Sequence, residues 1–175
     1  PKELFEIIVI NDGSEDNTLE VLKSYENYIS YYSIKNSERG YARNYGASKS
    51  KFKYLNFFDS DDLCLANHLI CAAGTIITNN FPEFIAQGFE MKTEDGKTTF
   101  KTNWRGNELL NKKLYKNILS CDGVFIRRDI ALENNFSNDR KVSGSEDWLL
   151  WFQIAHKYPI IASNAITHYV IEHNE

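Results

Sequence analysis

Three carboxylates stand close together in the segment FFDSDD, residues 57–62, directly after a run of aromatic side chains. Asp59, Asp61 and Asp62 repel one another where the dielectric is low, so either one of them takes up a proton or a cation settles between them. Oxygen ligands in an Asp-x-Asp pattern suit Mg²⁺ or Mn²⁺, which keep several waters and complete their shell from phosphates. The alternative is a solvated turn in which Asp59 and Asp62 cap the helix that follows.

Other polar groups also stand where they can do chemistry. Asp12, in NDGS, offers a carboxylate to a nucleobase or ribose, or else caps the next helix. Arg43, in GYARNYG, presents planar donors that match phosphate oxygens or a base edge, or else is a surface charge. Glu146 and Asp147, in GSEDW, fall in the first turn of a helix, where the macrodipole favours negative charge. A carboxylate held there can also serve as a general base.

These groups need a scaffold that brings strand ends together. The β-branched run FEIIVI predicts a strand buried on both faces, and the apolar stripe that follows predicts a helix from about residue 17 to residue 28. Strands at 29–34 and 53–58, with a short helix at 40–48 between them, continue the alternation. This order predicts parallel strands with crossover helices, in an α/β fold. Open sheets of this kind build their sites at the carboxyl ends of strands, where Asn11, Asp12 and the acids of FFDSDD fall.

The second half of the chain mixes helices with shorter strands. The patterns predict a strand at 83–91 that forms a hairpin with KTTFKT, and an amphipathic helix at 145–158 opened by Ser145. They also predict helices at 64–79 and 106–117, a strand entering a helix at 124–134, and two last strands, IIAS and ITHYVIEH. Since no repeat or linker interrupts the chain, one compact unit is expected.

Composition narrows the class of protein. The chain has 175 residues, a formal net charge of -4 and 42% hydrophobic residues, enough for one domain with a sizeable core. A sequence pI near 5.6 argues against a nucleic-acid-binding face. Three cysteines without paired spacing indicate free thiols in a reducing compartment. Because no run approaches the roughly 18 apolar residues of a membrane span, we expect a cytoplasmic protein and leave open a peripheral association with the inner face of the membrane.

Four motifs, taken together, resemble the family 2 inverting glycosyltransferases. They are EIIVINDGSEDNT, ERGYARNYGASKSKFKYLNFFDSDD, GSEDWLLW and HYVIEHNE, and they cover nearly the whole chain. The resemblance implies the GT-A fold, an α/β, Rossmann-like and mostly parallel sheet flanked by helices, with a small antiparallel portion in the C-terminal half. It also implies one domain over 1–175, with a nucleotide-binding part at 1–62 and an acceptor-side part at 63–175.

On the donor side, the resemblance assigns roles residue by residue. Asp12, with Asn11, would contact the base or ribose of a nucleotide-diphospho-sugar, although the family more often has Asp where Asn11 stands. Arg43 would contact the nucleotide. Asp59 and Asp61 match the outer residues of the Asp-x-Asp motif, which holds Mn²⁺ or Mg²⁺. Asp61 is the favoured metal ligand, and Asp62 is an alternate.

On the acceptor side, Glu146 and Asp147 match the family's Glu-Asp pair, and Asp147 matches the catalytic base. His173 would approach the metal or the diphosphate, or else is a surface residue. The reaction implied is a single displacement at the anomeric carbon by a hydroxyl of a glycan or another acceptor, in polysaccharide or glycoconjugate synthesis. Asp147 would take the proton from that hydroxyl.

The chain departs from the family pattern at its start, because the family usually begins with a further strand that packs centrally. PKELFEIIVI begins just after the place where that strand would end, so we expect an N-terminally truncated domain. A non-catalytic fragment that binds a sugar nucleotide or a glycan is therefore the alternative function. A phosphatase of the haloacid dehalogenase type is disfavoured, because Leu63 stands where that class needs Thr or Val.

Overall fold

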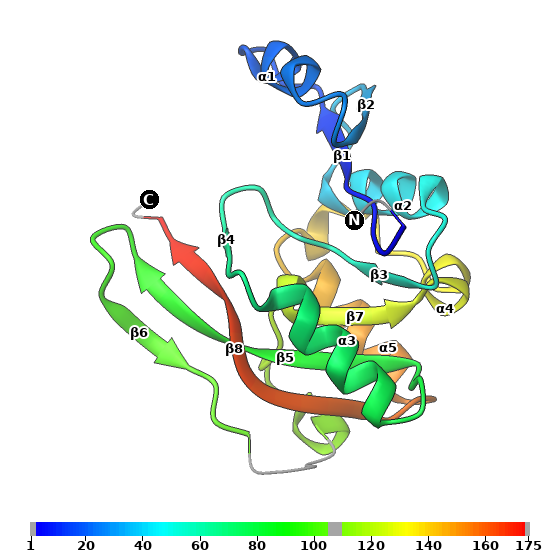
Figure 1. The fold of residues 1–175 in the computed structure, drawn as a ribbon, viewed down its shortest axis with the longest axis vertical. Helices are drawn as coiled ribbons and strands as arrows, with labels where there is room; N and C mark the ends of the chain where they lie inside the picture. The colour runs from blue at the N-terminus through cyan, green and yellow to red at the C-terminus, as the bar shows by residue number, and fades with distance from the viewer. Residues whose placement is uncertain (1–2, 105–109, 174–175) are drawn as a thin grey trace. The chain divides into compact units, whose positions relative to one another are not determined.

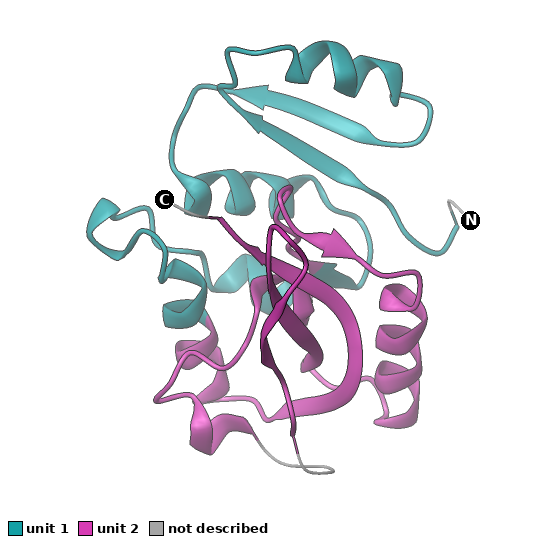
Figure 2. Ribbon diagram, turned by 90° about the vertical axis from the view of Figure 1, so that its left-hand side faces the viewer, with its two compact units in different colours: residues 1–55, 128–150 teal, residues 56–127, 151–175 magenta. Residues whose placement is uncertain are grey.

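Two units that alternate along the chain make up the computed structural model, which describes residues 3–104 and 110–173 (Figure 2). Unit 1 takes in residues 1–55 and 128–150, and unit 2 takes in residues 56–127 and 151–175. The sequence-based division at residue 62 into a donor part and an acceptor part stays a prediction.

Unit 1 holds the first βαβ segment. Strands β1 (Ile8–Asp12) and β2 (Ser30–Ile34) pair in parallel, and helix α1 (Thr18–Ser24) connects them, as the alternation predicted. Helix α2 (Arg39–Lys49) follows. Strand β3 (Tyr54–Asn56), which the alternation grouped with β1 and β2 among parallel strands, belongs to the other sheet, so that grouping is wrong. The unit closes with α4 (Arg128–Glu133), the 3₁₀ helix η3 (Arg140–Val142) and the start of α5 (Glu146–Ala155).

Strand β1 is less covered than its sequence predicted. Asn11 is its one buried residue, and the other four are only partly covered. In the part of the chain that the structure describes, β1 pairs with β2 alone. A two-stranded sheet gives few neighbours to each strand, so the expectation of burial on both faces is wrong here.

Helix α1 also differs from its prediction. It ends at Ser24 instead of near Tyr28, and Leu22 is its one buried residue. Tyr25 and Tyr28 of the predicted apolar stripe are 55% and 74% exposed. Asn17 makes no capping bond; the Asp16 carboxylate accepts from the N–H of Thr18 instead, at 3.0 Å. The spacing was therefore helical, but most of the stripe does not face a core.

Unit 2 is built on a mixed sheet (Figure 1). Its sheet has the order β3-β7-β5-β8-β4, with β6 added on β5. The pair β5–β8 is parallel, whereas β7 and β6 run antiparallel to β5 and β4 runs antiparallel to β8. The α/β class with an antiparallel portion is confirmed. The elements are β4 (Leu63–Cys64), α3 (His68–Thr78), β5 (Phe84–Thr93), β6 (Thr98–Lys101), η1 (Leu110–Lys113), η2 (Cys121–Gly123), β7 (Val124–Arg127) and β8 (Ile160–Glu172).

Strand β8 joins what the sequence predicted as two short strands. Ser163 pairs with Gln87 and Ile166 pairs with Gly88, so β8 carries two extra residues at this point. A further shift follows between Gly88 and Phe89. Bulges of this kind bend a strand without ending it, which is why the break in the apolar pattern did not mark a turn.

The core of unit 2 is built on strand β5, whose first six residues are all buried. Phe84, Ile85 and Ile160 are fully buried on the paired strands β5 and β8. Trp151, from the second turn of α5, is also fully buried, and its ring lies 5.5 Å from the ring of Phe84. Burying side chains of this size gives about 1.5–3 kcal/mol each, and because Phe84 and Ile85 are neighbours in one strand, both faces of β5 contribute.

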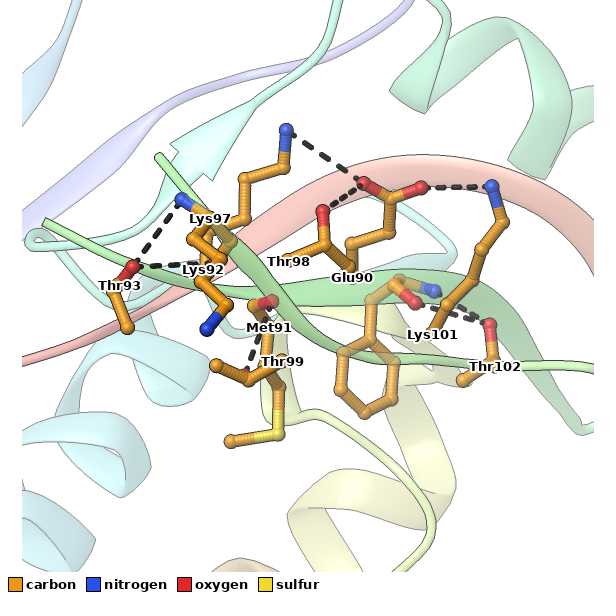
Figure 3. A network of polar contacts seen from close by, with 10 residues as sticks. Glu90, Met91, Lys92, Thr93, Lys97, Thr98, Thr99, Lys101 and Thr102 are labelled. Atoms are coloured by element: carbon orange, nitrogen blue, oxygen red, sulfur yellow. Dashed lines mark hydrogen bonds and ion pairs between the residues drawn. The ribbon is translucent and has the colours of Figure 1, made fainter. Parts of the chain in front are cut away.

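The predicted hairpin is confirmed between β5 and β6, with Gly96 at φ +86° in its turn. Glu90 is the centre of its surface network (Figure 3). Its carboxylate lies 2.8 Å from the ammonium of Lys101, 3.6 Å from that of Lys92 and 3.4 Å from the hydroxyl of Thr98. The contact between Glu90 and Lys101 joins two residues that pair across the hairpin, so it favours the observed register of β5 and β6.

The predicted helix at 106–117 falls partly on residues 105–109, which lie outside the described residues. Within the described remainder, the segment forms η1 only. The last two residues of the HYVIEHNE motif, 174–175, also lie outside. Over residues 3–104 and 110–173, none of the helices has the length and apolar character that a membrane crossing requires.

Candidate active site

An acidic cluster lies in unit 2, where Asp59, Asp62 and Asp122 each bring one carboxylate oxygen within 4.8 Å of the others. The N–H of Asp59 donates to Asp122 Oδ1 at 2.6 Å, and the N–H of Ile171 donates to Asp62 Oδ1 at 2.8 Å. Helix α3 begins only at His68, so the alternative that Asp59 and Asp62 cap it is wrong. The acids after β3 face a third carboxylate instead.

Asp122 is the member that sequence reasoning missed. It sits in η2, just before β7, and is 2% exposed. Its local sequence, SCDGVFI, leads into the strand predicted at the start of 124–134 and contains a single acidic residue. The available signal was a charged residue flanked by small and apolar ones, since Asp is almost never fully buried without a partner.

Burial, with repulsion as a smaller cause, raises the pKa values of Asp122 and Asp62. Burial, then a hydrogen bond with the Asp62 side chain and the charges of Asp62 and Asp59, raise the pKa of Asp122 to about 8. Burial also raises the pKa of Asp62, with further contributions from the charges of Asp61 and Asp59. The pair Asp62–Asp122 therefore holds a proton near neutral pH unless a cation is present. A set of oxygen ligands under such repulsion fits a hard divalent ion.

Asp61, the favoured metal ligand, lies apart from these three carboxylates. Its Oδ2 is 3.6 Å from Nε2 of His173, whose Nδ1 is 3.1 Å from Oε1 of Glu94. The hydrogen bond to Glu94, assisted by the charges of Asp61 and Asp62, raises the pKa of His173. The structure thus brings together two residues that the sequence assigned to the metal, at the exposed side of the acidic segment.

In unit 1, Arg43 and Glu146 form a buried ion pair. Arg43 Nη1 lies 2.7 Å from Glu146 Oε1, with the side chains 11% and 5% exposed. The guanidinium lies 5.3 Å from the ring centre of Phe136, and Glu146 Oε2 accepts from the N–H of Gly144 at 2.6 Å. Arg43 is therefore not a surface charge, and it contacts a residue that the sequence assigned to the acceptor.

The electrostatics of Glu146 follow from these contacts. Burial alone would raise its pKa, but its own backbone N–H, the charge and hydrogen bond of Arg43, and the N–H of Gly144 together lower it. Asp147, the next residue, is half-buried in the first turn of α5 and accepts from the N–H of Trp148 at 2.7 Å. Glu146 is thus held as a carboxylate, and Asp147 follows it on the same turn.

Asn11 and Asp12 organise the turn after β1. Asn11 is 6% exposed, and its side-chain oxygen accepts from the N–H of Ser14 at 2.9 Å. Asp12 Oδ1 accepts from the N–H of Ser37 at 2.9 Å. Gly13 adopts φ +77°, and a Cβ there would lie 2.7 Å from the backbone nitrogen of Asn36. Asn11 therefore closes the turn after β1, and Asp12 joins this turn to the segment after β2.

The fold is that of a GT-A glycosyltransferase. S. aureus TarS 1–349, in its crystal structure in complex with UDP, superposes with a TM-score of 0.78 at 21% sequence identity. The superposition covers 98% of this chain and 52% of the TarS 1–349 chain. Its crystal structure in complex with UDP-GlcNAc gives a TM-score of 0.75 at 19% identity, over 100% of this chain and 52% of that one.

Residues 1–133 match the family Glycosyl transferase family 2, and the chain belongs to that family. An uncharacterized glycosyltransferase of Rickettsia bellii is 32% identical over 160 residues, which span 89% of this chain and 23% of the relative. The O-antigen biosynthesis glycosyltransferase WbnJ of Escherichia coli is 25% identical over 167 residues, 90% of this chain and 63% of WbnJ. The chain therefore spans less than a quarter of the length of the Rickettsia bellii protein and less than two thirds of the length of WbnJ.

Proposed function

We propose that the protein transfers a sugar from a nucleotide-diphospho-sugar to an acceptor hydroxyl, with inversion and with the help of Mn²⁺ or Mg²⁺. Family membership supports the transfer reaction, and the UDP and UDP-GlcNAc complexes of TarS support the class of donor. The relation to WbnJ supports a part in polysaccharide or glycoconjugate synthesis.

The observation that carries the metal requirement is the cluster of Asp59, Asp62 and Asp122. In this proposal these three carboxylates hold the cation, with Asp61 and His173 as further candidate ligands. The cation would supply a Lewis acid for charge that builds up on the departing diphosphate. The raised pKa of Asp122 supports this role, because a carboxylate cluster that takes up a proton when empty is one that a cation stabilises.

Asp147 is proposed as the general base that takes the proton of the acceptor hydroxyl. Glu146 then has a different task, since its carboxylate is engaged by Arg43 and Gly144. It fixes the first turn of α5 and so the backbone that carries Asp147. Inversion follows from a single in-line attack by the deprotonated oxygen.

Nucleotide contacts are proposed for Asn11, Asp12 and Arg43. A guanidinium can serve a diphosphate as well as a carboxylate, because both offer paired oxygens. Arg43 would therefore share or exchange its contact with Glu146 when a nucleotide binds. Asn11 and Asp12 would act from the turn that their own hydrogen bonds hold in shape.

The test is a thermal-shift titration with UDP, with and without Mn²⁺, because stabilisation follows ligand affinity by mass action. We expect UDP with Mn²⁺ to raise the Tm of the wild type, and Asp59→Asn or Asp122→Asn to abolish the part of the shift that depends on Mn²⁺. The matched control is Asp95→Asn, which removes an exposed carboxylate of the same unit. If the Mn²⁺-dependent rise in Tm is unchanged in both Asp59→Asn and Asp122→Asn, the proposed metal role is refuted.

Transfer itself is tested with Asp147→Asn. This variant should keep the shift with UDP and Mn²⁺ but lose release of UDP from UDP-sugars in the presence of acceptor, and full turnover would exclude Asp147 as the base. The alternative function, a non-catalytic module that binds a sugar nucleotide or a glycan, predicts that the wild type binds but neither hydrolyses nor transfers any UDP-sugar.

A further inference from the structure

A series of buried polar side chains, each in contact with the next, leads from Asp122 into the core of unit 2. The hydroxyl of Ser120 donates to Asp122 Oδ2 at 2.9 Å, and Nε2 of His168 lies 2.9 Å from the same hydroxyl oxygen. Nδ1 of His168 lies 3.1 Å from the hydroxyl of Thr167, which contacts the amide oxygen of Gln87 at 3.0 Å. Ser120 is 9% exposed and the other three are at most 1% exposed. The chain runs from η2 through β8 to β5.

His168 is held tightly in this arrangement. Its ring stacks on Phe89 at 5.5 Å and 19°, and Phe58 meets its edge at 6.2 Å. Gly123, next to Asp122, allows the close approach, because a Cβ at this position would lie 2.8 Å from Cε1 of His168. The imidazole therefore has little room to move relative to the backbone that carries Asp122.

A second path supports the backbone of the same residue. The side-chain amide of Asn56 donates to the carbonyl oxygen of Asp122 at 2.7 Å and to that of Val124 at 2.8 Å. The oxygen of the same amide lies 3.0 Å from Nε2 of His68, whose Nδ1 lies 3.3 Å from the hydroxyl of Thr167. The two paths both start at Asp122 and meet at Thr167, so together they form a closed ring of contacts that includes Asp122.

The donors in this ring suit an ionised Asp122. A serine hydroxyl has a single hydrogen, and when Ser120 gives it to Asp122 Oδ2, its oxygen is left to accept from Nε2–H of His168. In this tautomer Nδ1 of His168 is an acceptor, so the single hydrogen of Thr167 goes to Nδ1 and not to the amide oxygen of Gln87. The N–H of Asp59 donates to the other oxygen, Oδ1. Burial, followed by the charge of His68, lowers the pKa of His168 to about 3, so the imidazole is neutral. It contributes a donor without adding a charge that would repel a cation.

We propose that Ser120 and His168 are positioning residues that orient the carboxylate of Asp122 toward the divalent cation. The inference rests on the proposed metal-dependent function and adds two residues that no Asp-x-Asp motif contains. Partners that hydrogen-bond to ligating carboxylates fix their orientation, and their loss typically lowers metal affinity about 10- to 100-fold.

The experiment measures the Kd of Mn²⁺ by electron paramagnetic resonance, with and without UDP, alongside the Tm. Ser120→Ala and His168→Leu each remove one link, and His168→Gln keeps an N–H donor on the side of Nε2. We expect Ser120→Ala and His168→Leu to weaken Mn²⁺ binding about 10- to 100-fold, and His168→Gln to recover most of the loss. The matched control is Thr102→Val, because Thr102 is 6% exposed and its hydroxyl accepts from the N–H of Phe89 at 2.9 Å.

The outcomes separate the two proposals. Mn²⁺ affinity that stays within about twofold of wild type in Ser120→Ala and His168→Leu, whatever their Tm, would overturn the positioning role and leave the metal site intact. A loss of the same size in Thr102→Val would also overturn it, since the effect would then be general loosening. A wild type that binds no Mn²⁺ refutes the metal-dependent function and this inference with it. If either Ser120→Ala or His168→Leu fails to fold, the Mn²⁺ affinity of the other variant tests the positioning role.

Discussion

Breaking the buried ion pair of Arg43 and Glu146 should lower the free energy of unfolding of unit 1 by several kcal/mol. Removing one member of a buried pair leaves the other charge without a partner, which costs about 3–5 kcal/mol. The side chains are 11% and 5% exposed, so water cannot take over the lost contact. Against a total stability of roughly 5–15 kcal/mol for a typical domain, either single variant should unfold at a much lower urea concentration.

A double-mutant cycle isolates the pair. Arg43→Met keeps apolar contact with Phe136, and Glu146→Gln keeps an acceptor for the N–H of Gly144. The double variant should cost only about 1–2 kcal/mol, chiefly the cation–π contact and imperfect packing. The two single costs together should therefore exceed the cost of the double variant by at least about 4 kcal/mol, which is the coupling energy. The measurement is urea unfolding followed by far-UV circular dichroism, with m-values compared to check that the transition is unchanged.

The exposed pair Arg140–Glu38 in the same unit is the matched control. Its members are 83% and 27% exposed at 2.5 Å, so its coupling should stay below about 1 kcal/mol. Additivity of the Arg43 and Glu146 variants within about 0.5 kcal/mol would refute the argument, because it would mean that the two side chains do not meet in solution.

Acid should weaken the buried pair in a defined direction. The pKa of Glu146 is lower in the folded protein than the ordinary value of 4.5. The contribution of the pair is therefore complete above that value and is lost as the pH falls through the folded pKa. The coupling energy measured at pH 7 should shrink in acid.

Three further predictions concern unit 2. Because the folded pKa of Asp122 is raised to about 8 from 3.8, cation-free wild type should lose stability as the pH rises between those values; Asp122→Asn should therefore raise the Tm at pH 8 without Mn²⁺ but not at pH 4, as read by differential scanning fluorimetry. Gly123→Ala should cost about 1–3 kcal/mol in urea unfolding, because the new Cβ would lie 2.8 Å from Cε1 of His168 and 2.8 Å from the backbone oxygen of Gln87; a neutral result would mean that both the ring and the strand backbone move. Phe84→Ala should cost about 3–5 kcal/mol, whereas Ile70→Ala, at a side chain that is 72% exposed, should stay within about 0.5 kcal/mol.

Local patterns were sufficient for most elements of the fold. The turn NDGS, the βαβ segment and the hairpin at Gly96 rest on short-range rules of strand, helix and turn residues, and all three are present. The errors arose where tertiary contacts decide. Whether the stripe of α1 is covered, whether β3 pairs with β1, and whether a bulge bends β8 or ends it all depend on neighbours distant in the sequence.

The site was predictable only in its motif residues. Asp59 and Asp62 belong to a visible cluster, but Asp122 is 60 residues or more away and carries no motif of its own. Arg43 and Glu146 were both singled out, yet their ion pair was not, because it joins residues 103 positions apart. Residue types could be read from the sequence, but which of them face one another is a property of the folded chain.

The late position of β8 has a consequence for the order of folding. His168 pairs in register with Phe89, 79 residues earlier, and such long-range pairings form slowly because loop closure precedes any gain from contact. During synthesis Asp59 and Asp122 leave the ribosome well before the strand that carries His168. The contacts that β8 makes through His168 and through the N–H of Ile171 are therefore present only after β8 docks on β5, so the proposed cation site is complete only after that docking.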